Sequence, residues 1–488
     1  MGSSTGAEGL APHAAVLPIP TLGHITPFLH LSRTLASRGF VITFINTEGN
    51  HRDLKDVVSQ EESFGYGGGI RFETVPGIQA SEADFTAPET RQIFFEAVMA
   101  MQGPVESLLI RSMARDDDLV PPVSCFISDM LLPWSAEVAR RTGIPEVKFW
   151  TASASCVLLD CSFPRMLEKG DVPVQETSDP DSVIDFIPGI DSLSIKDIPS
   201  SLLTSTPEGL ERRSRIFSRN KEAACIFLNT VEELERKVVA AIQELLRPAK
   251  FLTIGPLLPS SFLSDHPADE NTVSAEGVWK EDMHCLSWLD EREPRSVLYV
   301  SFGSMATLKA NQIEKLALGL ESSGQPFLWV MRPNLVSESE APNFCEDFVV
   351  RTKSQGLVIS WAPQLQVLKH PSVGGFLTHC GWNSTLEAVC SGVPLLCWPC
   401  FAEQHLNCKI IVDDWKVGLS FFRGSCHGVA SKEVVHQVIR RLMVEDPGKE
   451  IRKRAIELRN EIRSTVTEGG SSDRNLSAFV DLISKRLV

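Results

Sequence analysis

The sequence contains no long hydrophobic run and no excess of positive charge. Its longest uncharged apolar stretch, 388–402, is interrupted by one glycine and two prolines. A membrane-spanning helix needs about 20 consecutive apolar residues, so we expect no stable insertion into a membrane. Lysine and arginine total 47 against 62 aspartates and glutamates, and the net charge of −15 argues against nucleic acid as a partner.

The N-terminal residues also lack the features of a secretion signal. Residues 1–13 contain neither a cationic segment nor an apolar one, so the expected location is the cytoplasm. The twelve cysteines are accordingly expected to be reduced thiols in apolar surroundings. Hydrophobic residues make up 43% of the chain and charged residues 22%, which is the balance of a folded globular protein.

Short apolar runs alternate with helical patterns in two successive series. This alternation is typical of parallel β-sheets with helices on both faces. The expected strands are 14–19, 41–45, 70–75, 123–128, 147–150, 225–229 and 251–254 in the first series, and 297–302, 327–331, 357–360, 375–378, 394–398 and 418–421 in the second. The sequence therefore predicts an α/β protein with two doubly wound parallel-sheet domains.

The segment 256–293 separates the two series. It is rich in Pro, Ser, Asp and Glu and lacks periodicity, so we expect a linker between a first domain, 1–255, and a second, 294–470. The last segment, 471–488, has a helical pattern after two glycines and is expected to dock back on the first domain. A chain of 488 residues suits two large domains, and we expect a monomer.

Polar residues follow two strands of the first series that should be neighbours. In open parallel sheets ligands bind beyond the carboxyl ends of strands, where the strand order reverses, and strands 1 and 4 commonly meet there. The first strand is followed by His24 and the fourth by Asp129. An imidazole held by a carboxylate is a general base, so this pair is a candidate catalytic site. The alternative is that His24 only caps a helix and Asp129 lies in a solvated turn.

The same rule brings together two loops of the second domain. These are the loop 301–304 and the turn 379–384, which opens a helix and contains Gly381, Asn383 and Ser384. Free N–H groups and the helix dipole attract an anion there, and His379 adds a donor. The sequence therefore predicts an anion site, although ordinary helix capping would use the same residues.

Two further patterns allow a metal or redox interpretation. Cys397 and Cys400 have redox spacing, and with His405 and Cys408 they resemble a zinc knuckle whose last gap is too short. The acidic triplet 116–118 resembles a cation site, but no expected strand precedes it. Packing of an apolar strand end and a solvated charged loop are the preferred interpretations, and we expect no metal.

The segment from Trp361 to Gln404 reads WAPQLQVLKHPSVGGFLTHCGWNSTLEAVCSGVPLLCWPCFAEQ. It closely resembles, without a gap, the 44-residue signature of plant family 1 UDP-glycosyltransferases. PTLGH, FISD and VSFGS extend this resemblance over nearly the whole chain. It implies the GT-B fold, in which two Rossmann-like domains face each other across a cleft. It also implies that the first domain binds an acceptor and the second a UDP-sugar.

The resemblance implies roles for individual residues of the donor site. Trp361 matches the residue that stacks on uracil, Glu387 the one that takes the ribose hydroxyls. Ala362 and Gln364 match the positions that contact the edge of the uridine. The positions that contact the diphosphate are matched by His379, Asn383, Ser384 and Ser304. The positions that contact the sugar are matched by Thr151, Trp382, Glu403 and Gln404. Glu403 departs from the family pattern, where Asp is more usual, and this departure bears on the donor sugar.

The resemblance also implies the reaction. His24 and Asp129 match the catalytic pair of an inverting transferase that moves glucose from UDP-glucose to a hydroxyl, without a metal or other cofactor. The acceptor is expected to be a small apolar plant metabolite such as a flavonoid, phenolic or terpenoid. Apolar candidates for its pocket, each equally an ordinary core residue, are Phe94, Phe95, Leu131, Leu132 and Trp134. The alternatives are a non-catalytic UDP-sugar-binding module and transfer to nitrogen, sulfur or carbon.

Overall fold

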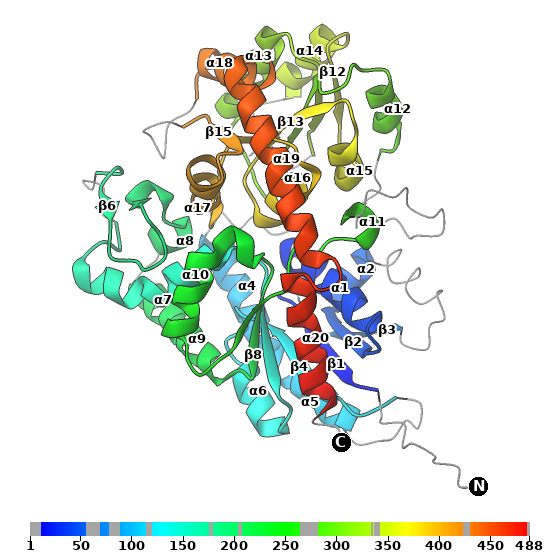
Figure 1. Cartoon of the computed structure of the whole chain (residues 1–488), viewed down its shortest axis with the longest axis vertical. Helices are drawn as coiled ribbons and strands as arrows, with labels where there is room; N and C mark the ends of the chain where they lie inside the picture. The colour runs from blue at the N-terminus through cyan, green and yellow to red at the C-terminus, as the bar shows by residue number, and fades with distance from the viewer. Residues whose placement is uncertain are drawn as a thin grey trace.

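The computed structural model has two lobes, each built on a parallel β-sheet (Figure 1). It describes residues 11–54, 69–77, 88–113, 120–174, 179–203, 207–263, 282–332, 335, 342–422 and 430–485.

The first sheet has seven parallel strands in the order β3-β2-β1-β4-β5-β8-β9. In that order the strands are Ile70–Val75, Val41–Thr47, His13–Leu17, Cys125–Asp129, Glu146–Trp150, Cys225–Leu228 and Phe251–Thr253. The order reverses between β1 and β4, whose Leu17 and Ser128 are paired in register. The predicted neighbourhood of strands 1 and 4 is confirmed, and the ends of these two strands open toward the other lobe.

The second sheet has six parallel strands in the order β12-β11-β10-β13-β14-β15. They are Gly356–Ile359, Phe327–Val330, Val297–Ser301, Val373–Thr378, Leu395–Cys397 and Gly418–Ser420. The four inner strands are mostly apolar and fully buried, as expected for strands that are covered by helices on each side, whereas the edge strands β12 and β15 are largely half-buried. Here the order reverses between β10 and β13, which places loops 301–304 and 379–384 at one edge.

Helices cover both faces of each sheet. In the first lobe they are α1 (Leu22–Ala36), α2 (Glu48–Asp53), α4 (Pro88–Ala100), α5 (Gln102–Met113), α6 (Ser135–Thr142), α7 (Ala154–Lys169), α8 (Ser200–Leu203), α9 (Pro207–Arg219) and α10 (Glu232–Leu245). In the second they are α12 (His284–Asp290), α13 (Ala310–Ser323), α14 (Pro342–Thr352), α15 (Gln364–Lys369), α16 (Trp382–Ser391), α17 (Gln404–Lys409), α18 (Lys432–Met443) and α19 (Asp446–Val466). A small hairpin, β6 (Val183–Ile184) with β7 (Leu193–Ser194), lies between α7 and α8.

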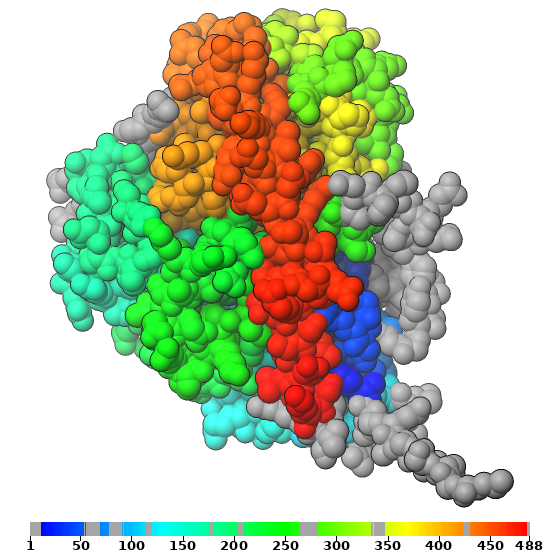
Figure 2. Space-filling model, in the orientation of Figure 1, coloured from blue at the N-terminus to red at the C-terminus, as the bar shows by residue number. Residues whose placement is uncertain are grey.

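The C-terminal helices run from the second lobe across to the first (Figures 1 and 2). The long α19 packs on α16, and α20 (Ser471–Ser484) packs beside β9 in the core of the first lobe. Phe479 stacks with Phe40 at 6.0 Å between ring centroids and meets Phe227 edge-on at 4.7 Å. Thus the chain crosses between the lobes twice, once through 256–293 and once before α20.

Two segments differ from the expectations of the sequence. The described part of 256–293 contains α11 (Ser260–Leu263) and α12, and α12 packs against β12, so the end of this segment belongs to the second lobe. The segment Gln92–Met113 is 22 residues long and has a mean hydropathy of 1.4, so it is long and apolar enough to span a membrane. It consists of two helices that part at Met101, and α5 packs against α6; core helices can be equally long and apolar, so this stretch is weak evidence for a membrane.

Candidate active site

The predicted pair of His24 and Asp129 forms at the edge where the first sheet reverses. His24 lies in the first turn of α1, and its Nδ1 is 2.6 Å from Asp129 Oδ2 at the end of β4. Asp129 is fully buried, and its two oxygens also accept the backbone N–H groups of Ile19 at 3.3 Å and Leu131 at 3.0 Å. The carboxylate is therefore held in one orientation by both flanking loops.

This contact fixes the state of the His24 imidazole. The proton of a neutral ring lies on Nδ1, directed at Asp129, which leaves Nε2 as the basic nitrogen. Burial lowers the pKa of His24, but the negative charge and hydrogen bond of Asp129, with a smaller contribution from Glu403, outweigh it and raise the pKa above 6.5. Thr151 Oγ1 also lies 3.1 Å from Nδ1, so this residue contacts the base.

The turn after β13 and the loop after β10 enclose His379. Gly303 has φ of +67°, and a Cβ there would lie 2.6 Å from His379 Cε1; one on Gly381 would lie 2.4 Å from Nε2. Glycine at both positions therefore makes room for the imidazole. Gly381 also precedes α16, whose first turn has no side-chain cap, and Ser304 and Ser384 line the same cavity. The N–H groups of that turn are the expected anion donors.

Sequence reasoning missed Arg332, which supports this anion site from behind. It follows β11, is buried, and donates from Nε to the Gly303 carbonyl at 2.8 Å and from its terminal nitrogen to the Ala306 carbonyl. Burial lowers the pKa of Arg332 to about 10, so it remains a cation at neutral pH. Burial, and then the charge of Arg332, lower the pKa of His379 to about 4. His379 is therefore neutral, so it can offer an anion an N–H group but no positive charge.

A hydrogen-bonded group of side chains occupies the opposite end of the donor site. Gln364 Nε2 donates to Glu387 Oε2 at 2.5 Å and to Ser384 Oγ at 3.0 Å, and its Oε1 accepts from Tyr299 at 3.1 Å. Burial raises the pKa of Glu387 to about 7, although the hydrogen bond from Gln364 lowers it in part. Trp361 and Ala362 line the cavity beside this group, as the resemblance implies.

Trp382 and Asn383 connect the lobes as well as lining the cavity. Trp382 Nε1 donates to the Asn229 carbonyl at 2.7 Å, and Asn383 Nδ2 donates to the Gly23 carbonyl at 2.8 Å. Gly23 immediately precedes His24. The start of α16 is thus tied directly to the first turn of α1, which carries His24.

Glu403 and Gln404 stand between the two lobes at the start of α17. Gln404 is buried, and its Oε1 accepts the backbone N–H groups of Cys400 at 2.8 Å and Phe401 at 3.0 Å. Only its NH₂ group is therefore left for a ligand. Burial raises the pKa of Glu403, opposed in part by the charges of His24 and Arg213.

One cavity of about 1220 Å³ is lined both by His24 and by the residues expected to bind the donor. Of the apolar residues expected to bind an acceptor, Leu131 lines it. The structure instead places Leu132 and Trp134 in the core, where Trp134 Nε1 donates to the Val98 carbonyl at 2.8 Å, because the chain turns back under the sheet after β4. Phe94 packs partly buried on that core, and neither Phe94 nor Phe95 lines the cavity.

Other residues form the wall beside His24. They are Trp150, Ala152, Cys156, Ser201, Arg213 and Phe401. Arg213 forms a bidentate pair with the fully buried Asp160, using Nε and, at 2.9 Å, its terminal nitrogen. Three of these residues, Cys156, Ser201 and Arg213, come from α7, α8 and α9, whose folding over the sheet has no short signal in the sequence.

The two metal interpretations have different outcomes. Cys397 and Cys408 do lie together, but the third thiol of the group is Cys380, and Cys400 is not part of it. The acidic triplet 116–118 lies outside the described residues.

The chain is similar to known glycosyltransferases. The family model described as UDP-glucoronosyl and UDP-glucosyl transferase matches residues 257–442. The 7-deoxyloganetin glucosyltransferase of Catharanthus roseus is 37% identical over 497 residues, which covers 100% of this chain and 99% of that protein. The (R)-mandelonitrile beta-glucosyltransferase of Prunus dulcis is 38% identical, with 98% and 97% covered. Phytolacca americana UGT2, solved with UDP-2-fluoro-glucose and pterostilbene, superposes with a TM-score of 0.78 at 29% identity, covering 97% of this chain and 100% of that one.

These relationships span the full length of the chain, so it belongs to the plant family 1 UDP-glycosyltransferases. It is a UDP-sugar-dependent glycosyltransferase with the GT-B fold.

Proposed function

We propose that this enzyme transfers glucose from UDP-glucose, with inversion at the anomeric carbon, to a hydroxyl group of a small and largely apolar plant secondary metabolite. The observation that carries the proposal is that His24, which Asp129 holds from behind, lines the same cavity as the residues expected to bind the donor. A base and a leaving-group site that share one cavity allow a direct displacement between two bound substrates.

In this mechanism His24 Nε2 removes the proton of the acceptor hydroxyl as its oxygen attacks the anomeric carbon. Asp129, fully buried at 2.6 Å from Nδ1, stabilises the imidazolium that forms. The bond from the anomeric carbon to UDP breaks on the opposite face, which inverts the configuration. The first-turn N–H groups of α16 and the N–H of His379 meet the negative charge that develops on the diphosphate.

This distribution of charge makes a metal unnecessary in the proposed mechanism. The UDP leaving group is balanced by helix N–H groups and by Arg332 behind the loop 301–304. We further propose that the enzyme acts as a cytoplasmic monomer. Because the proposed mechanism needs no metal, activity should be unaffected by EDTA.

The wall beside His24 supports a mostly apolar acceptor with one polar contact. Trp150, Leu131 and Phe401 supply flat or aliphatic surface, and Arg213 supplies a guanidinium whose other side is held by Asp160. The related enzymes named for 7-deoxyloganetin and (R)-mandelonitrile support a small plant alcohol as the acceptor. We propose that the hydroxyl lies at His24 and that a second polar group of the acceptor faces Arg213.

The test is an assay with UDP-glucose and a panel of terpenoid, cyanohydrin and phenolic alcohols, in the presence of EDTA. Mass spectrometry identifies the product, and proton NMR gives the configuration of the new bond. We expect a β-glucoside from the α-linked donor. Donor binding without any product would instead favour the non-catalytic module, and products from thiols or anilines alone would reject the hydroxyl as acceptor.

A further inference from the structure

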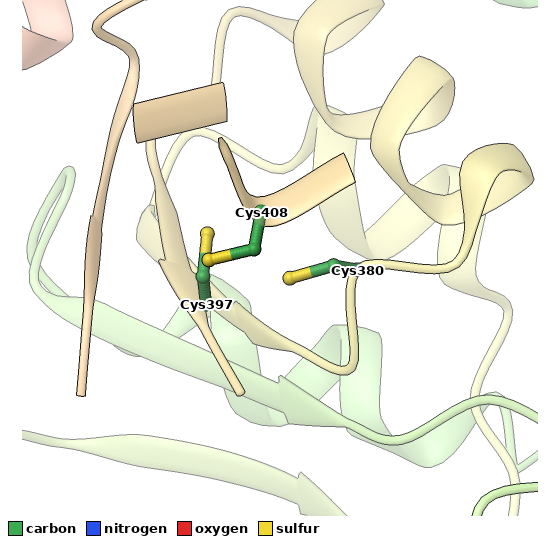
Figure 3. Close-up of side chains that lie close together, drawn as sticks. All are labelled: Cys380, Cys397 and Cys408. Atoms are coloured by element: carbon green, nitrogen blue, oxygen red, sulfur yellow. The ribbon is translucent and has the colours of Figure 1, made fainter. Parts of the chain in front are cut away.

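Three thiols meet in the core of the second lobe, behind the donor site. Cys380 lies in the turn after β13, Cys397 ends β14, and Cys408 is on α17. Figure 3 shows their sulfur atoms directed toward one another from these three elements. All three sulfur atoms lie within 4.8 Å of one another, although the residues are distant in the sequence.

The spacing of the thiols matches a metal site with three sulfur ligands. Sulfur atoms bound to one ion at about 2.3 Å stand about 4 Å apart, so small side-chain rotations close the ring. All three cysteines are free, and Cys380 and Cys397 are fully buried while Cys408 is 9% exposed. Among the described residues, no fourth histidine, cysteine or carboxylate joins the group.

We propose that Cys380, Cys397 and Cys408 form a binding site for a soft, thiol-seeking metal ion, Cu(I). Thiolate ligands select soft ions, whereas a structural zinc ion takes four ligands in a tetrahedron. Each sulfur that binds the ion releases its proton to solvent, so one cation partly replaces the lost protons in the buried site. The ion is separate from the reacting atoms, and the proposed transfer of glucose does not use it.

The site is connected to the donor loop through Cys380. This residue lies between His379 and Gly381 and has φ of +65°, a strained backbone for a non-glycine residue. Its carbonyl accepts a hydrogen bond from Asn407 on α17 at 2.9 Å. A metal ion that pulls the Cys380 side chain toward Cys397 and Cys408 therefore changes the turn that holds His379. We expect copper to lower turnover through this turn.

The experiment is an anaerobic titration of the purified full chain with Cu(I), in competition with a chromogenic Cu(I) chelator. Cys397→Ala removes one ligand. Cys390→Ala is the matched control, because Cys390 is a fully buried free thiol on α16 outside the cluster. We expect one tightly bound ion in the unsubstituted protein and in Cys390→Ala, and at least a hundredfold weaker binding in Cys397→Ala. Circular dichroism checks that both variants are folded.

Turnover with UDP-glucose is measured in the same titration. We expect at least a tenfold loss at one equivalent of Cu(I), recovery when excess chelator is added, and resistance of Cys397→Ala. The binding measurement does not depend on the proposed reaction. Failure of the unsubstituted protein to compete for copper, or equal affinity in Cys397→Ala, would overturn the site. Tight binding with unchanged turnover would overturn its connection to the donor loop.

Discussion

At the residue scale, the proposed chemistry depends on how Asp129 is held. Its two oxygens accept hydrogen bonds from two backbone N–H groups as well as from His24, so it has little freedom to turn away from the imidazole. A carboxylate in this position both selects the tautomer of the base and raises its pKa. The sequence suggested this pair because each residue follows a strand, and parallel strands end at the same edge.

The raised pKa of His24 gives a pH dependence. A base must be unprotonated to work, so kcat/KM should fall as the pH drops through the pKa of His24, with an acid limb above pH 6.5. In Asp129→Asn the charge that raises this pKa is lost while burial still lowers it, so the limb should move to lower pH and the plateau should be lower. The check is a pH profile of both proteins with an unactivated alcohol; an unmoved limb would contradict the assignment.

Gln404 allows a sharper test of sugar recognition. Its Oε1 is used by the N–H groups of Cys400 and Phe401, so its NH₂ group and the Glu403 carboxylate are the parts left to contact sugar hydroxyls. Gln404→Glu keeps the accepting oxygen but replaces the NH₂ donor with a second oxygen, which adds a negative charge beside Glu403 when it is ionised. An unpaired buried polar group costs about 1–3 kcal/mol, so kcat/KM with UDP-glucose should fall about tenfold to a hundredfold.

The same cost should separate the donors in the unsubstituted enzyme. Galactose turns its 4-hydroxyl axial, so we expect UDP-glucose to be preferred by at least tenfold in a competition assay with one acceptor. Equal use of the two donors, or an unchanged kcat/KM of Gln404→Glu with UDP-glucose, would show that Glu403 and Gln404 do not recognise the sugar.

At the element scale, the donor site is an edge of the second sheet shaped by two glycines and α16. Gly381→Ala would place a Cβ 2.4 Å from His379 Nε2, so the imidazole or the helix start must shift. We expect at least a tenfold weaker affinity for UDP, measured by calorimetry. Gly103→Ala on α5 is the control, because an added Cβ there meets nothing within 4 Å. Equal UDP affinity in both variants would contradict this view of His379.

The elements that the sequence predicted best are those whose own residues carry the signal. Buried strands appear as apolar runs, and the turn before α16 appears as a glycine with Asn383 and Ser384 after it. These two residues were expected as caps, but they lie inside α16, whose N-cap is Gly381 without a side-chain cap. The wall beside His24 was not predicted, because Arg213 and Cys156 belong to it through the packing of α9 and α7 over the sheet. Similarly, Cys380 joins Cys397 and Cys408 through tertiary packing, whereas the short spacing suggested Cys400.

At the scale of the whole molecule, α20 helps to hold the two lobes together. It continues from α19 of the second lobe, and its Phe479 is buried between Phe40 and Phe227 of the first. Phe479→Ala should destabilise the first lobe by about 3–5 kcal/mol, since large core truncations leave a cavity. Ile93→Ala, at a side chain that is 60% exposed, is the control. Chemical denaturation followed by fluorescence gives the free energy of unfolding of both variants. Equal values for Phe479→Ala and Ile93→Ala would contradict the docking of α20.

The alignment of the lobes also determines whether the base can reach its substrate. Asn383 at the start of α16 bonds the Gly23 carbonyl, and Ala402 beside Glu403 exchanges two hydrogen bonds with Ser200. These contacts keep the anion site of one lobe opposite the base of the other. Sequence patterns predicted two facing domains through the family resemblance, but not which residues would bridge them.

The central claim is that His24 is the base for a hydroxyl acceptor bound in this cavity. The most direct measurement is the turnover of His24→Ala with UDP-glucose and an alcohol that needs a base, together with its affinity for UDP. We predict a loss of turnover of about 10²–10⁴-fold with little change in UDP binding, because the donor contacts lie in the other lobe. Turnover close to that of the unsubstituted enzyme would contradict the claim.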